Sequence, residues 1–169
     1  MTLPFIEPDD NIYLNLCITI ILLQQLGRTK KGTVKINNER LHIYQYLVKN
    51  PVKLNQVLAV LGKDSVLISQ QESYSVASIS SNVDPLFDRE SLKALITILV
   101  AKKYVDVEYK KKEGFFYTLS SLGDDKATAL TDNYFFEIKM LCEKLQTTLS
   151  VNLSNLNQAL SQIMRRESF

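Results

Sequence analysis

The sequence predicts a mainly α-helical protein of the α+β class that contains one small β-hairpin. Two observations support this prediction: apolar residues recur at helical spacing along most of the 169 residues, and one stretch alternates as paired strands do. The hydrophobic content of 46% and the charged content of 22% are ordinary for a folded globular protein. A chain of this length can bury a full core, as one domain or as one domain with extensions.

The expected hairpin lies in the second half of the chain, between two helices. Apolar residues at helical spacing across Leu92–Leu99 predict a helix, and the β-forming run Tyr104–Val107 predicts a strand. The polar run Lys110–Gly114 predicts a turn, and Phe115–Leu119 predicts the returning strand. Ser120–Leu130 then leads into another helix. This order is that of the second half of a winged helix-turn-helix.

Three more helices are expected before this unit and two after it. The first spans Asn11–Gly27, a second begins near Asn38, and a third spans Pro51–Gly62, with proline and glycine at their favoured ends. Beyond the hairpin, amphipathic patterns predict helices over Leu130–Leu149 and Leu153–Met164. The expected fold is therefore a winged helix-turn-helix with extra N-terminal and C-terminal helices.

These elements suggest three parts of the chain. Residues 1–36 hold the N-terminal helix and a basic loop and are expected to form an interface element, 37–130 form the winged-helix domain, and 131–169 form a C-terminal helical extension. A serine-rich insert occupies 63–86. Connections this long are uncommon in compact domains and are often functional, so the insert is a candidate contact surface. A packed, irregular insert is an equal alternative.

The first helix carries no charge and is apolar over nearly its whole circumference. It is shorter than the roughly 20 residues that a membrane span needs, and polar residues interrupt it, so we expect a buried or interfacial helix and no membrane. Ile18, Ile21 and Leu22 are its candidate interface residues.

Residues suited to catalysis are scarce. His42 is the single histidine, and the stretch Gly27–Thr33 has P-loop glycine spacing but carries Thr33 where the loop needs a lysine. The acidic pair Asp124-Asp125 stands at an expected helix start, where carboxylates are stabilised by the helix dipole. We therefore expect no catalytic residue, no metal and no cofactor, and a protein that is not an enzyme.

The two cysteines, Cys17 and Cys142, lie far apart among apolar residues. Neither a disulfide framework nor a metal knuckle fits this spacing, so free buried thiols are expected. A reducing, cytoplasmic location follows from this interpretation.

Basic residues are the candidate contacts to DNA phosphates or to an acidic partner. They lie in the hairpin turn, just before the first strand, and in the loop after the first helix: Lys110, Lys111, Lys112, Lys102, Lys103, Arg28, Lys30 and Lys31. The net charge of +2 does not by itself predict strong nonspecific binding to nucleic acid. Any DNA contact is therefore expected to be local.

The helix before the hairpin is a poor candidate for reading bases. Its apolar residues from Leu92 to Val100 cover an arc of about 200° when residues are placed at 100° intervals. The remaining face carries Lys93 and Thr97 but little that makes bidentate contacts to base edges. An arc this wide favours packing on two sides, and Ile98 and Val100 are candidate residues of a protein interface.

Two resemblances follow from short motifs. Phe116–Ser120, followed by Gly123 and Ala127, is similar to the wing-to-helix junction of bacterial regulators of the multiple-antibiotic-resistance type. A broader set of segments resembles the small middle component of ABC-three-component systems, the group that includes Lamassu-type anti-phage defence. These segments are Leu3–Pro8, Tyr13–Leu16, Gly27–Thr29, Leu47–Pro51, Leu86–Glu90 and Lys112–Tyr117.

The second resemblance implies a bacterial accessory subunit without catalytic residues, which works beside an SMC-like ATPase and an effector, often a nuclease. It would hold the effector on the ATPase until foreign or aberrant DNA is sensed. The alternative is a homodimeric winged-helix transcriptional regulator that binds DNA, and an enzyme is a distant third. Direct contact to double-stranded DNA and homodimerisation stay open.

Overall fold

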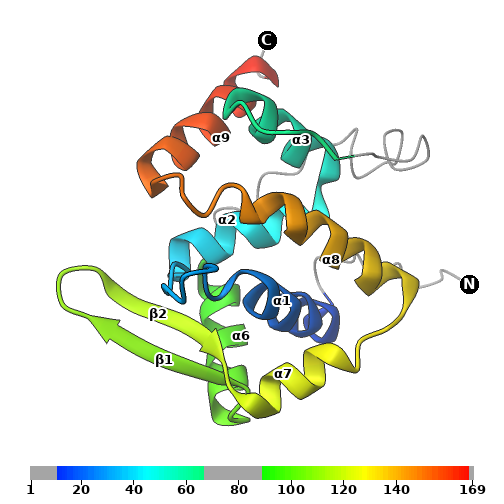
Figure 1. Cartoon of the computed structure of the whole chain (residues 1–169), viewed down its shortest axis with the longest axis vertical. Coiled ribbons are helices and arrows are strands. Elements are labelled where there is room, and N and C mark those ends of the chain that lie inside the picture. Colours follow the sequence, from blue (N-terminus) through cyan, green and yellow to red (C-terminus); the bar gives the residue numbers. More distant parts are fainter. Residues whose placement is uncertain (1–10, 67–88, 168–169) are drawn as a thin grey trace, which may run out of the picture.

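The computed structural model of the chain describes residues 11–66 and 89–167 (Figure 1). Its elements are α1 (Ile12–Leu26), α2 (Asn38–Lys49), α3 (Pro51–Val60), α6 (Arg89–Ala101), β1 (Val105–Lys110), β2 (Gly114–Leu119), α7 (Ser121–Thr128), α8 (Asn133–Gln146) and α9 (Leu153–Glu167). The predicted fold class is confirmed at this level, since the described chain is mainly helical and carries one small antiparallel sheet.

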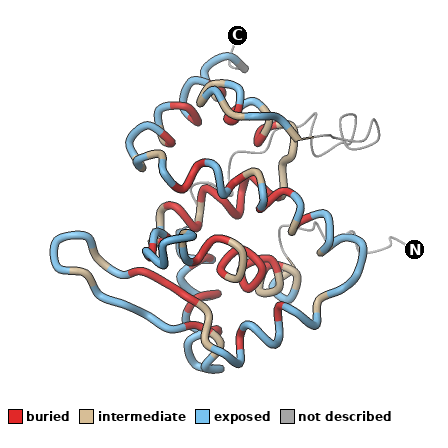
Figure 2. The backbone as a smooth tube through the Cα atoms, viewed as in Figure 1, coloured by how far each residue is buried: buried red, intermediate tan, exposed pale blue. Residues whose placement is uncertain are grey.

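Helix α1 lies in the middle of the core. It contacts α2, α6, α7, α8 and the hairpin, and the buried residues of the chain concentrate on it and on the helices around it (Figures 1 and 2). Ile18 and Ile21 are 0% exposed and Leu22 is 1% exposed. The sequence pattern predicted a buried or interfacial helix and made these three residues candidates for a protein interface. The structure corrects the interface candidates, because the three side chains pack inside the chain itself and the helix is buried.

The polar residues that interrupt α1 join it to α2. The Thr19 hydroxyl donates a 2.7 Å hydrogen bond to the Asn15 carbonyl and accepts a 2.9 Å hydrogen bond from the Gln45 side-chain amide. Buried polar groups must be paired, so this network favours one alignment of the two helices. No helix in the described part of the chain is long and apolar enough to cross a membrane.

The hairpin forms where the sequence predicts it. Strands β1 and β2 pair antiparallel from Val105↔Leu119 to Lys110↔Gly114. Lys112 and Gly114 adopt positive φ values of 74° and 92° in the turn, a conformation that glycine adopts without strain. The backbone N–H of Tyr117 also donates a 2.9 Å hydrogen bond to the Ile36 carbonyl, so the segment before α2 covers the outer edge of β2.

A buried arginine holds the connection between α8 and α9 against α2. The Arg40 guanidinium donates hydrogen bonds of 2.7 Å to the Val151 carbonyl, 3.3 Å to the Thr148 carbonyl and 3.1 Å to the Tyr44 hydroxyl. The Tyr44 and Thr148 hydroxyls lie 2.6 Å apart. Because backbone carbonyls and a hydroxyl solvate the charge, Arg40 can stay 5% exposed in the core.

The predicted helix ends are largely confirmed. Pro51 opens α3, and Gly62 follows its last turn with φ of +71°. The helix expected from Leu130 begins later, at Asn133, with Asp132 in extended conformation before it.

Of the expected insert at 63–86, only residues 63–66 are described, and Val66 exchanges two hydrogen bonds with the Asn55 side chain. The division into 1–36, 37–130 and 131–169 stays a prediction.

Candidate functional site

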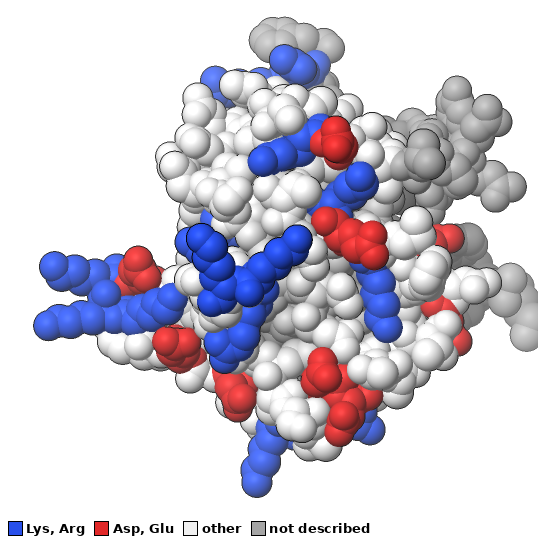
Figure 3. Space-filling view, viewed as in Figure 1, with Lys and Arg blue, Asp and Glu red and all other residues white. Residues whose placement is uncertain are grey.

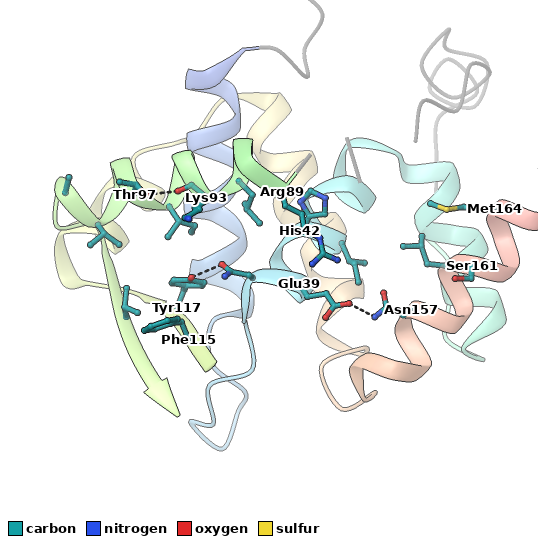
Figure 4. A pocket seen from close by; sticks show the side chains of 18 residues that line it. Glu39, His42, Arg89, Lys93, Thr97, Phe115, Tyr117, Asn157, Ser161 and Met164 are labelled. Carbon is teal, nitrogen blue, oxygen red and sulfur yellow. Dashed lines mark hydrogen bonds between the residues drawn. The ribbon is translucent and has the colours of Figure 1, made fainter. Parts of the chain in front are cut away.

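A groove with a cavity volume of about 920 Å³ opens between α2, α6, the hairpin and α9. Figure 4 shows Phe115 and Tyr117 of the hairpin on one side and Ser161 and Met164 of α9 on the other. Glu39 of α2 lies between the two sides. Residues more than a hundred positions apart in the sequence therefore share one surface.

Helix α6 supplies one long side of the groove through two parallel rows of side chains. Each row repeats every four residues, which is the spacing of neighbours on one face of a helix. The rows are Leu92, Ile96 and Val100, and Arg89, Lys93, Thr97 and Ala101. Helix α6 begins at Arg89, so this face carries an arginine that the sequence analysis did not count.

The lining of the groove is largely apolar, and part of it faces solvent. Val100 is 38% exposed, Val107 is 45% exposed and Phe115 is 52% exposed. Leu160 and Met164 continue the apolar lining on α9. Exposed apolar side chains that share one concave surface indicate a binding site more strongly than scattered ones do.

The polar side chains of the groove are largely engaged within the protein. The Asn157 amide donates a 2.7 Å hydrogen bond to the Glu39 carboxylate, and the Tyr117 hydroxyl donates one of 2.7 Å to the Asn38 side-chain oxygen. Burial raises the pKa of Tyr117, so the phenol stays protonated and keeps its hydrogen bond to Asn38.

The single histidine, His42, lies half-buried on α2 and lines the groove. Within the described residues, no group of three or more His, Cys, Asp or Glu side chains is arranged to hold a metal ion.

Burial raises the pKa of both cysteine thiols. The pKa of Cys142 rises to about 12, with a smaller contribution from Glu143, and the pKa of Cys17 is also raised. Both thiols are free and are poor nucleophiles in the folded protein.

A second surface is basic, and we call it the basic edge. It consists of exposed side chains of the loop between α1 and α2 and of the hairpin turn, together with half-buried Lys110: Arg28, Lys30, Lys31, Lys110, Lys111 and Lys112. Basic side chains gather at these two places in Figure 3.

A hydrogen bond from the Lys110 side chain joins the two parts of the basic edge. The Lys110 ammonium donates a 3.1 Å hydrogen bond to the Val34 carbonyl and lies 4.5 Å from the centre of the Phe116 ring. Arg28 and Val34 pair as an isolated bridge, and the Arg28 guanidinium donates to the Gly32 carbonyl at 3.3 Å. The structure therefore brings six of the eight predicted basic contacts to one edge.

The other two predicted basic contacts lie elsewhere. Lys102 and Lys103 are exposed at the end of α6, where the chain enters β1. The six residues of β1 separate them from the hairpin turn, a distance of about 20 Å at 3.3 Å per residue. These two lysines therefore lie outside the basic edge.

The residues predicted to form a protein interface also lie in different places. Ile98 is half-buried and Val100 lines the groove, whereas Ile18, Ile21 and Leu22 lie in the core.

Sequence reasoning missed the groove residues of the hairpin and of α9. The adjacent apolar residues Phe115 and Phe116 were an available signal, since neighbours in a strand point to opposite faces and both faces therefore needed a partner.

Comparison with known proteins gives one match. A family model described as ABC-three component (ABC-3C) system Middle Component 4 matches residues 26–158, which is more than half of the chain. No curated protein and no solved structure matches the chain. The matched range includes the whole basic edge and most of the groove.

Proposed function

The chain belongs to the Middle Component 4 family of ABC-three-component (ABC-3C) systems, and from this premise we propose a more specific role for it. We propose that it is a non-catalytic winged-helix adaptor of a Lamassu-type anti-phage defence complex. In this role it joins an SMC-like ATPase to an effector nuclease, in the cytoplasm. Family membership supports the coarser part, which is that the protein works as one component of a multi-component system.

The order of elements supports the winged-helix part of the proposal. Helices α2, α3 and α6 precede the hairpin, and α7 follows it. The hairpin is fixed at its root, because the Tyr104 N–H donates to the Leu99 carbonyl and the Ser120 N–H donates to the Tyr104 carbonyl, at 2.9 and 3.0 Å. In this assignment α6 takes the position of the recognition helix and the hairpin is the wing.

The scarcity of base-reading side chains in the second half of the exposed face of α6 is the observation that carries the adaptor role. A helix that reads DNA presents polar side chains to base edges. Here the exposed row continues from Arg89 and Lys93 into Thr97 and Ala101, beside exposed Val100. Only the first turns of the helix offer charge, while the rest suits an apolar protein surface.

Contact to the DNA backbone is a second, compatible part of the proposal. Five side chains of the basic edge are exposed and make the edge locally cationic: Arg28, Lys30, Lys31, Lys111 and Lys112. Cations of this kind bind phosphates without reading sequence. The adaptor would then touch DNA held by the complex without choosing its sequence.

A homodimeric transcriptional regulator is the second candidate function, and the basic edge is the observation that favours it. A wing carrying lysines commonly follows the backbone while a recognition helix reads the major groove. The last two turns of the exposed face of α6 argue against this alternative, because Val100 and Ala101 there would leave base edges without hydrogen-bond partners.

Purification with and without the proteins encoded beside it separates the two functions. The adaptor should co-purify with the ATPase and the effector and should bind unrelated duplexes about equally. A free homodimer that selects one operator sequence over the others, with no companion subunit attached, would contradict the adaptor role and support the regulator.

A further inference from the structure

We infer that the groove between α2, α6, the hairpin and α9 is the docking site for an amphipathic helix of a companion subunit, whose polar flank is acidic. This inference rests on the proposed function, because it names the segment through which the adaptor holds a partner. The shape of the groove, its apolar lining and its charge all suit such a helix.

The surface of α6 suits another helix. Two helices pack when the ridges formed by residues four apart on one lie in the grooves of the other. The groove side of α6 offers one exposed row, from Arg89 to Ala101, and beside it a second row in which Leu92 and Ile96 are buried and Val100 is exposed. The small side chains of Thr97 and Ala101 allow a close approach. With 13 residues, α6 is about 20 Å long and matches a partner helix of three to four turns.

The two sides of the groove suit an apolar stripe. Val107 and Phe115 rise from the hairpin on one side, and Leu160 and Met164 lie on α9 on the other. A helix of about 10 Å diameter placed between them would cover Val100, Val107 and Phe115, which now face solvent. Removing these side chains from water supplies the driving force.

Charge complementarity defines the polar flank of the partner. Arg89 and Lys93 line the groove at the first turns of α6, where the helix dipole adds positive potential. The one carboxylate among the lining residues, that of Glu39, already accepts a hydrogen bond from Asn157. An Asp or Glu beside the apolar stripe of the partner would therefore meet two cations.

The same features disfavour DNA in the groove. A duplex would leave Val107, Phe115 and Leu160 against charged phosphates and would gain no hydrogen bonds from them. The exposed cations of the basic edge lie in the α1–α2 loop and the hairpin turn, which are not among the lining residues. A protein helix in the groove and a DNA backbone on the basic edge could thus be bound together.

The test uses the full chain assembled with the two other subunits of its ABC-3C system. A photo-crosslinking amino acid at Thr97, which is exposed on α6 and lines the groove, reports what occupies it. We expect crosslinks to one face of a single companion helix, with Asp or Glu beside that face. Crosslinks to DNA, to a second copy of this chain or to residues 67–88 of the same chain would overturn the inference. A small molecule that co-purifies in the groove, or no crosslink in the assembled complex, would also overturn it.

Affinity measurements give an independent readout. Val100→Glu should weaken binding of the companion subunit at least about tenfold, because it places a charge against the apolar stripe. Phe136→Glu is the matched control, since Phe136 is 61% exposed on α8 and is not among the groove residues. Lys93→Glu should weaken binding and should be rescued by an Asp or Glu→Lys change in the partner helix. Thermal unfolding of each variant checks that the fold is intact.

The outcomes separate the inference from the proposed function. If the wild-type chain assembles with the companion subunits and the groove variants assemble equally well, the inference fails and the adaptor role stands. If the wild-type chain binds neither subunit, the adaptor role fails, and the inference fails with it.

Discussion

The Lys110 ammonium donates a 3.1 Å hydrogen bond to the Val34 carbonyl and thereby ties the end of the hairpin to the loop between α1 and α2. The same ammonium lies over the Phe116 ring, which adds a cation–π contact. Two basic segments that are distant in the sequence become one edge, beside a groove that is mostly apolar.

The basic edge should determine the salt dependence of DNA binding. Replacing both Lys111 and Lys112 with glutamate should weaken binding to any duplex and should reduce the slope of log affinity against log salt by about 2, as expected for two lost phosphate contacts. Fluorescence anisotropy over a salt series measures both quantities. The double change of Lys102 and Lys103 to glutamate is the control, because it alters charge equally at the far end of β1. A slope for the Lys111 and Lys112 variant that equals the wild-type slope would exclude these two lysines from DNA binding.

Arg40 should be a major contributor to stability. Arg40→Met removes hydrogen bonds to the Thr148 and Val151 carbonyls and leaves both buried acceptors without this donor. We expect a loss of about 3 kcal/mol in the free energy of unfolding, measured by urea titration. Tyr44→Phe removes only the hydroxyl partner and should cost about 1 kcal/mol. A loss below about 1 kcal/mol for Arg40→Met would contradict the anchoring role.

The Cys142 thiol should make the protein less stable at alkaline pH. Burial raises the pKa of this thiol from 9.0 to about 12, so it stays protonated in the folded protein while the unfolded chain ionises. Its contribution is complete below pH 9 and declines by about 1.4 kcal/mol for each pH unit above that value. Urea titrations at pH 8 and pH 10 should therefore show a steeper decline for the wild type than for Cys142→Ala. Parallel declines would contradict the raised pKa.

Gly123 should be intolerant of alanine although it lies in a helix. A Cβ atom there would collide with the Tyr104 carbonyl oxygen and approach the Leu119 Cδ2 atom to 2.9 Å. The collision would push α7 off the root of the hairpin, so we expect a loss of about 2 kcal/mol despite the higher helix propensity of alanine. Asp125→Ala, at an exposed position of the same helix, should change the free energy of unfolding by less than about 0.5 kcal/mol. Calorimetric melting of the two variants decides this point.

Local patterns were sufficient to predict the elements. Pro51 and Gly62 bound a helix because their backbone preferences act within a few residues, and the hairpin turn at Lys110–Gly114 depends on glycine in the same way. The position of α1 was less predictable. A helix apolar on all sides must be buried, but periodicity does not say whether its own chain or another protein buries it. Here the helices around it in the same chain do so.

The candidate site was predictable only in part. The lysines of the hairpin turn were visible as a run in the sequence. Their position beside the loop that carries Arg28 depends on the hydrogen bond between Lys110 and Val34, which are 76 positions apart. The groove requires α9 to lie opposite the hairpin, and this depends on how Arg40 holds the connection before α9. Such long-range packing leaves no periodic trace in the sequence, so Leu160 and Met164 looked like ordinary core residues of an amphipathic helix.

The adaptor role is tested most directly by sedimentation of the ATPase and the effector with and without this chain. Analytical ultracentrifugation should show one complex of all three subunits when the chain is present. When it is omitted, the ATPase and the effector should sediment separately, and Val100→Glu should resemble omission. An ATPase and an effector that associate equally well without the chain would contradict the adaptor role.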